Sequence, residues 1–91
     1  MTDKERKERL EKDIERAALG KQVMKNPMFQ EALTARKAQI FDVFCKTKQE
    51  QGDIREEAWR TMKNLEALEK YFVQLLESGK MAEQKMEAIE K

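Results

Sequence analysis

Small or apolar residues recur at heptad spacing through the last third of the sequence. The repeat begins at Ala58 and continues to Ile89, largely in alternating steps of three and four residues. Its two positions hold, in chain order, Ala58, Leu65, Leu68, Phe72, Leu75, Gly79, Ala82, Met86 and Ile89. Such spacing lays a continuous seam along one side of a helix, and only other helices can bury it. We call these residues the heptad seam, and they predict a helical protein that packs against further helices.

The composition agrees with long, solvated helices in a single small domain. Of the 91 residues, 41% are charged and 40% hydrophobic, with one Pro and three Gly. No run of about 18 uncharged apolar residues occurs, so we expect no membrane span. Residues 1–6 carry charges where a signal peptide would need an apolar stretch. Together with Cys45, which has no second cysteine to pair with, this predicts a cytosolic protein.

Breaks in the pattern divide the chain into three predicted helices. Pro27 lacks a backbone donor but suits the first position of a helix, and Asn26 before it is a favourable N-cap. The second helix should therefore run over residues 27–48. A polar linker that ends at Gly52 should reverse the chain, and Asp53 is the expected N-cap of the third helix.

The predicted fold is all-α, a long antiparallel helical hairpin that resembles a coiled coil and carries an N-terminal helical arm. The arm is the charged segment 1–25, and its start fits a capping box of Thr2 and Glu5. The hairpin is residues 26–91, with helices at 27–48 and 53–91 and a kink allowed at residues 78–79.

The two hairpin helices differ in length, so they cannot cover each other completely. At 1.5 Å per residue the third helix would span about 55 Å and the second about 32 Å. The seam beyond about Leu75 is then covered either by Leu10 to Met24 of the arm or by another chain. A small domain with a thin core is marginally stable alone, so we expect a homo-oligomer. The expected contact residues are Leu65, Leu68, Phe72, Leu75, Met81, Met86 and Ile89.

Aromatic residues lie on both sides of the predicted reversal. Phe41 and Phe44 come near the end of the second helix and Trp59 near the start of the third, so these three should close the hairpin. The run Ile40–Cys45 is apolar nearly all round, which predicts burial on more than one side. Cys45 is accordingly expected as a small buried residue.

The sequence offers little for catalysis, a cofactor or a metal. It has no histidine, which is the commonest general base and a frequent metal ligand. Cys45 has no neighbouring base to activate it, and the carboxylates alternate with Lys and Arg as on a solvated helix face. Neither a phosphate-binding loop nor a cysteine cluster for zinc is present. We therefore expect a protein that is not an enzyme and has no cofactor.

Charge is unevenly distributed along the chain. Residues 17–49 hold six basic and two acidic side chains, a net charge of +4, whereas residues 50–91 have a net charge of −3. This polarity could guide one copy onto another or the middle of the chain onto nucleic acid. The candidate nucleic-acid contacts are Lys21, Lys25, Arg36, Lys37, Lys46 and Lys48. A helix-turn-helix is not expected, because acidic residues crowd the start of the third helix.

Four short runs of sequence suggest a family. They are Arg16–Ala18, Asn26–Leu33, Gly52–Trp59 and Ser78–Ala82. In these runs the chain resembles a group of small helical proteins encoded in tailed-phage and prophage head or packaging gene clusters. The resemblance covers roughly residues 16–86. It implies a role in virion assembly, genome packaging or minor virion structure, in the host cytoplasm or the virion, with phage structural or packaging proteins as partners.

The sequence thus predicts a non-enzymatic helical interaction protein of phage type that acts through helix–helix contacts. Two alternatives stay open. One is a nucleic-acid-binding accessory factor for genome packaging, and the other is a small inhibitor of a host protein.

Overall fold

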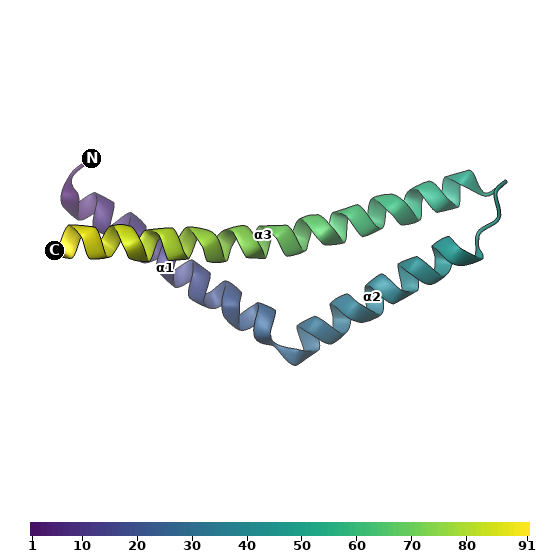
Figure 1. Ribbon diagram of the computed structural model, residues 1–91, viewed down its shortest axis with the longest axis horizontal. Helices are drawn as coiled ribbons and strands as arrows, with labels where there is room; N and C mark the ends of the chain where they lie inside the picture. The colour runs from purple at the N-terminus through teal and green to yellow at the C-terminus, as the bar shows by residue number, and fades with distance from the viewer. The chain divides into compact units, whose positions relative to one another are not determined.

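The computed structural model describes residues 1–91 and contains three α-helices and no strand. They are α1 (Asp3–Lys25), α2 (Pro27–Lys46) and α3 (Gly52–Glu90). Figure 1 shows that α3 is continuous over its whole length, including residues 78–79 where a kink was allowed. The predicted all-α class is confirmed.

The helices form two compact units. The continuous unit is Asn26–Lys70, which holds α2 and the first half of α3. The discontinuous unit joins Met1–Lys25 to Tyr71–Lys91, and so pairs α1 with the second half of α3. The predicted division into residues 1–25 and residues 26–91 stays a prediction.

The caps of α2 follow from the residues at its ends. Asn26 Oδ1 accepts hydrogen bonds from the backbone N–H groups of Met28 (2.8 Å) and Phe29 (3.4 Å), which confirms the predicted N-cap. At the other end the Thr47 backbone is extended, and its hydroxyl donates to the Phe44 carbonyl oxygen at 2.8 Å. The helix therefore ends at Lys46, two residues before the predicted end.

The start of α3 differs from the prediction in its cap. The Gln51 carbonyl oxygen accepts from the backbone N–H groups of Ile54 and Arg55, so Gln51 takes the cap position expected for Asp53. The Gln51 side chain is used as well, because its Oε1 accepts from the Lys48 N–H at 2.8 Å and so closes the linker on itself. Asp53 lies instead in the first turn, where a carboxylate is favoured by the positive end of the helix dipole.

Small residues bring α1 and α3 close together in the discontinuous unit. Its buried positions are Leu10, Ala17 and Gly20 on α1 and Gly79 and Ala82 on α3. A Cβ atom built at Gly79 would overlap the Cβ of Ala17, so only glycine permits this approach.

This packing shows which of the two expected arrangements covers the second half of the seam. Because α1 lies against it, Ala82 is only 2% exposed and Met86 and Ile89 are half-buried. A hydrogen bond from Arg16 Nη2 to the Tyr71 hydroxyl oxygen, 3.1 Å long, also joins the two helices. The arm covers this part of the seam within the chain.

The continuous unit has a thin core. Its buried apolar residues are Leu33 and Ile40 on α2 and Ala58 on α3. An ion pair between Lys37 Nζ and Glu69 Oε1 (2.6 Å) ties the two helices together beside this core. No side chain in the protein is completely buried. The helices of this unit therefore contact each other along a narrow stripe.

Replacing Gly79 tests the close approach of α1 and α3. Gly79→Ala should lower the free energy of unfolding by about 1–3 kcal/mol despite the better helix propensity of Ala, because the Ala17 Cβ is fixed to its helix and cannot turn away. The control is Gly52→Ala, whose Cβ meets no atom within 4 Å and which should change the same quantity by less than about 1 kcal/mol. Urea unfolding followed by circular dichroism measures both.

A double-mutant cycle separates this contact from a general loss of helix stability. Ala17→Gly removes the opposing Cβ, so the pair Ala17→Gly and Gly79→Ala should show a favourable coupling energy of about 1 kcal/mol. Strictly additive losses would contradict the close approach.

Candidate helix-contact surface

The heptad seam mostly faces helices of the same chain. Ala58, Gly79 and Ala82 are buried. The half-buried seam residues are Leu65, Phe72, Leu75, Met86 and Ile89. Among the predicted oligomer contacts only Leu68 and Met81 are exposed, at 44% and 56%. Packing inside the two units thus covers most of the seam residues that were predicted to contact another chain.

The run Ile40–Cys45 is not buried on several sides as expected. Ile40 is 5% exposed, but Phe41 is 64% exposed and Cys45 is exposed as well. The prediction of a buried Cys45 is therefore wrong. The physical reason is that α2 has only one neighbouring helix in the continuous unit, and this neighbour covers the stripe that contains Ile40. Apolar residues elsewhere around α2 have nothing to pack against.

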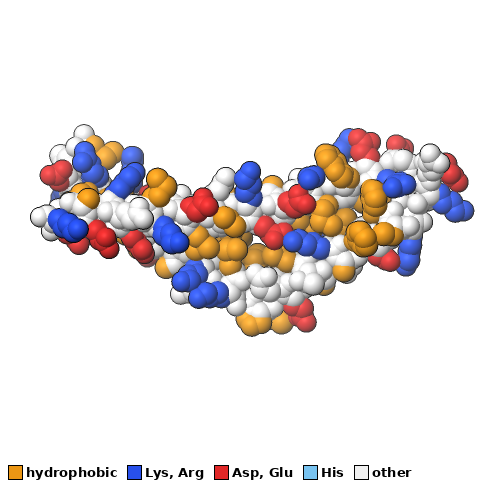
Figure 2. Space-filling model, in the orientation of Figure 1, with side chains coloured by type: hydrophobic (Ala, Val, Ile, Leu, Met, Phe, Trp, Pro, Cys, Tyr) orange, Lys and Arg blue, Asp and Glu red, His pale blue; other side chains and the backbone are white.

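Three exposed aromatic residues and the half-buried Met62 gather on one side of the continuous unit. Figure 2 shows hydrophobic side chains collected over α2 and the first half of α3. A hollow of about 200 Å³ there is lined by apolar residues only, namely Ile40, Phe41, Phe44, Ala58, Trp59 and Met62. We call its four outer residues, Phe41, Phe44, Trp59 and Met62, the apolar face.

The predicted closing residues Phe41, Phe44 and Trp59 are therefore brought together. They line an open hollow, because Trp59 remains 56% exposed and Phe41 projects into solvent. Met62 completes the group and was missing from the sequence prediction. The spacing of three residues from Trp59 to Met62 places both on one side of α3, which is the signal that could have found it.

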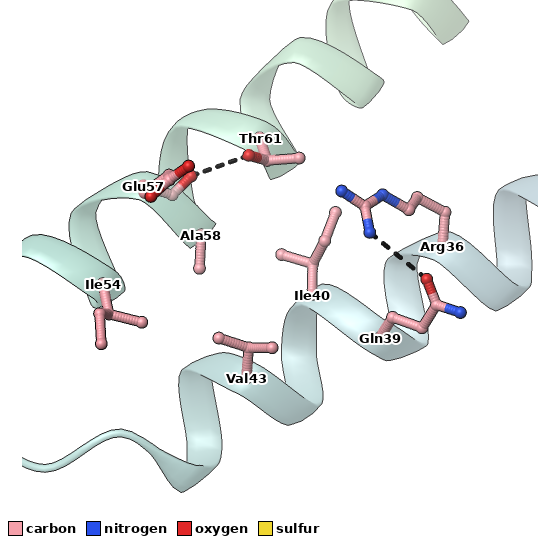
Figure 3. A pocket seen from close by; sticks show the side chains of 8 residues that line it. All are labelled: Arg36, Gln39, Ile40, Val43, Ile54, Glu57, Ala58 and Thr61. Carbon is pink, nitrogen blue, oxygen red and sulfur yellow. Dashed lines mark hydrogen bonds between the residues drawn. The ribbon is translucent and has the colours of Figure 1, made fainter.

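The opposite side of the same two helices is mixed in character. It has a second hollow, of about 180 Å³, which Ile40 and Ala58 also line and which is bordered by polar and apolar side chains. Figure 3 shows its lining residues Arg36, Gln39, Ile40, Val43, Ile54, Glu57, Ala58 and Thr61. Arg36 Nη1 donates to Gln39 Oε1 at 3.4 Å on this side, so a charged group and an amide border the hollow. The continuous unit is a two-helix layer with one apolar side and one side of mixed character that includes charged residues.

Charged groups border the apolar face on α3. The Arg55 guanidinium carbon lies 4.4 Å from the ring centroid of Phe44, and Lys63 Nζ lies 5.7 Å from the ring of Trp59. Such cation–π contacts contribute about 0.5–1 kcal/mol at exposed sites. Lys63 also pairs with Glu66 at 3.2 Å. The Arg55 guanidinium thus lies at the end of the face next to the linker, and the ion pair of Lys63 and Glu66 lies at the other end.

The six basic residues proposed for nucleic acid do not come together in one unit. Lys21 and Lys25 belong to the discontinuous unit, and the other four to the continuous unit. Of those four, Lys37 pairs with Glu69, Lys46 pairs with Asp42 at 3.0 Å and Arg36 is hydrogen-bonded to Gln39. Nucleic-acid binding and inhibition of a host protein stay predictions.

The structure holds no cluster of three or more His, Cys, Asp or Glu side chains that could ligate a metal ion. None of the three helices has an apolar stretch of the length and low charge that crossing a bilayer requires.

No family model, no curated protein and no solved structure matches the chain. The apolar face is the surface on which a functional argument can be built.

Adjacent residues on α2 test the assignment of core and surface. Ile40→Ala should lower the free energy of unfolding by about 2–5 kcal/mol, because Ile40 fills the narrow contact between the helices. Phe41→Ala should lower it by less than about 1 kcal/mol, because the ring is largely in solvent. Urea unfolding of both variants at low protein concentration makes the comparison, and equal losses would contradict the assignment.

Proposed function

We propose that this protein is a non-enzymatic helical interaction protein that binds other helices through the apolar face of its continuous unit. The observation that carries the proposal is the hollow between Phe41, Phe44 and Trp59, which has no polar lining residue. Complete burial of one such side chain is worth about 1.5–3 kcal/mol, and aromatic residues and Met are enriched at the centres of protein interfaces.

The proposal of a non-enzymatic role is supported by side-chain chemistry. The sequence has no histidine, and Cys45 is exposed without an ion pair or hydrogen bond to a base that would activate it. The carboxylates that form ion pairs do so with Lys or Arg on solvated surfaces, for example Glu56 with Arg60 at 2.7 Å. Such exposed ion pairs each contribute well under about 1 kcal/mol to the stability of the helix.

The biological setting in this proposal is virion assembly or a minor structural role in a tailed phage. Support comes from the resemblance carried by the runs Asn26–Leu33 and Gly52–Trp59. The second run ends at Trp59, which is the first residue that α3 contributes to the apolar face. The partners in this setting are phage structural or packaging proteins and further copies of the chain.

The arrangement of the continuous unit fits such a role. Phe44 near the end of α2 lies beside Arg55 near the start of α3, and Lys37 farther from the linker pairs with Glu69 farther along α3. These contacts support the antiparallel hairpin that the sequence predicted. A hairpin presents two parallel ridges with a hollow between them, and a helix of a partner can lie in such a hollow.

Photo-crosslinking tests whether the apolar face binds protein. The photoreactive residue p-benzoylphenylalanine replaces Phe41 in one variant and Met28 in the control, since both side chains are more than 60% exposed but Met28 lies outside the hollow. Irradiation of cells that carry the native gene should give a discrete covalent adduct from position 41 and little from position 28. No adduct at position 41, or equal adducts at both, would contradict the proposal.

A further inference from the structure

We infer that the partner of the apolar face is a second copy of this chain, held antiparallel along α3 about a two-fold axis between Trp59 and Met62. This inference rests on the proposed function, because it names the occupant of the same surface. The evidence for it is the order of charged and apolar side chains along one stripe of α3.

The stripe consists of Arg55, Trp59, Met62 and Glu66. Steps of four, three and four residues place all four on the same side of a helix. Trp59 and Met62 line the apolar hollow. Arg55 lies over the Phe44 ring, which lines the same hollow, and Glu66 pairs with Lys63, which lies over the Trp59 ring. Both charged residues therefore border the apolar face.

The order of charges in this stripe is self-complementary. Read in one direction it is positive, aromatic, apolar, negative, and an antiparallel copy presents the reverse. Arg55 and Glu66 are about 16 Å apart along the helix axis, and the midpoint between them lies beside Trp59 and Met62. A two-fold axis through this midpoint places Arg55 of each copy opposite Glu66 of the other, and Trp59 opposite Met62. An isologous interface needs this kind of match.

Contacts within the chain leave the charges of Arg55 and Glu66 available for an ion pair with another chain. Arg55 has a cation–π contact but no ion pair. Glu66 pairs only with Lys63, and both of those side chains are about half exposed, so this pair contributes little. A partner of one charge sign would satisfy one end of the stripe and repel the other, whereas a second copy satisfies both.

The difference between the two sides of the continuous unit gives a second reason for face-to-face pairing. Charged residues border the hollow on one side and only apolar residues line the hollow on the other, so burial favours the apolar side, as in a four-helix arrangement of two hairpins. Pairing in this way would cover Phe41 and Trp59 and leave Arg36 and Glu57 in solvent.

Size-exclusion chromatography with light scattering of the full chain is the first test. At about 50 μM the wild type should have twice the 10.8 kDa mass of one chain. Trp59→Glu should have the mass of one chain with unchanged helicity, because Trp59 is not part of the core. Val43→Glu, a matched change of an exposed apolar residue on the opposite side of the same unit, should remain a dimer. A wild-type monomer at this concentration would overturn the inference.

Charge reversal tests the two-fold geometry itself. Arg55→Glu and Glu66→Arg should each raise the dimer Kd at least about tenfold, because each places like charges opposite each other twice. Mixing these two single variants should restore a dimer, since the hetero-pair has an acid opposite a base at both positions. Restoration on mixing supports the antiparallel register, and a mixture no tighter than either variant alone would overturn it.

The outcome also separates this inference from the proposed function. An adduct of position 41 with a different protein, together with a monomeric wild type, would overturn the dimer while supporting a contact role for the apolar face. An adduct of position 41 with a second copy of the chain, which has twice the mass of one chain, would support both the dimer and the contact role.

Discussion

A helix that touches only one other helix can bury only a narrow stripe of its surface. Both units are built under this constraint, because each pairs two helices. In the discontinuous unit the stripe includes small residues, and Ala17 against Gly79 lets the backbones approach closely. In the continuous unit aromatic residues surround the stripe, and a single neighbour cannot cover them. Large apolar residues beside a narrow stripe thus remain exposed in the continuous unit and form its apolar face.

Local signals in the sequence were sufficient to predict the helices. Asn26 before Pro27 specifies a helix start through one side-chain acceptor and one fixed backbone angle, and the structure has that cap. From the sequence alone, Gly79 is compatible with a helix cap or with a close approach of two backbones. No glycine in the structure has a positive φ, so Gly79 is an interior helical residue that gives room to Ala17. The heptad repeat has the same register before and after Gly79 because α3 continues through this position.

Burial was harder to predict, because an apolar pattern does not show how many neighbours a helix has. Phe41 and Cys45 belong to an apolar run, and their exposure follows from the single neighbour of α2 rather than from their own chemistry. The stripe from Arg55 to Glu66 was missed for a related reason. The heptad pattern identifies the side of α3 that packs inside the chain, whereas this stripe lies on an adjoining side of the same helix. Recognising it requires knowing which side α2 already covers.

The way in which the two units share the chain also has a consequence for the order of folding. The continuous unit is one uninterrupted segment, so all of its contacts lie within residues 26–70. Helix α1 is made first but finds its partner last, since that partner begins at Tyr71. Contacts between distant segments form more slowly than local ones, and domains fold in the order in which they are synthesised. We therefore expect the surface for protein contact to form before the first helix has docked.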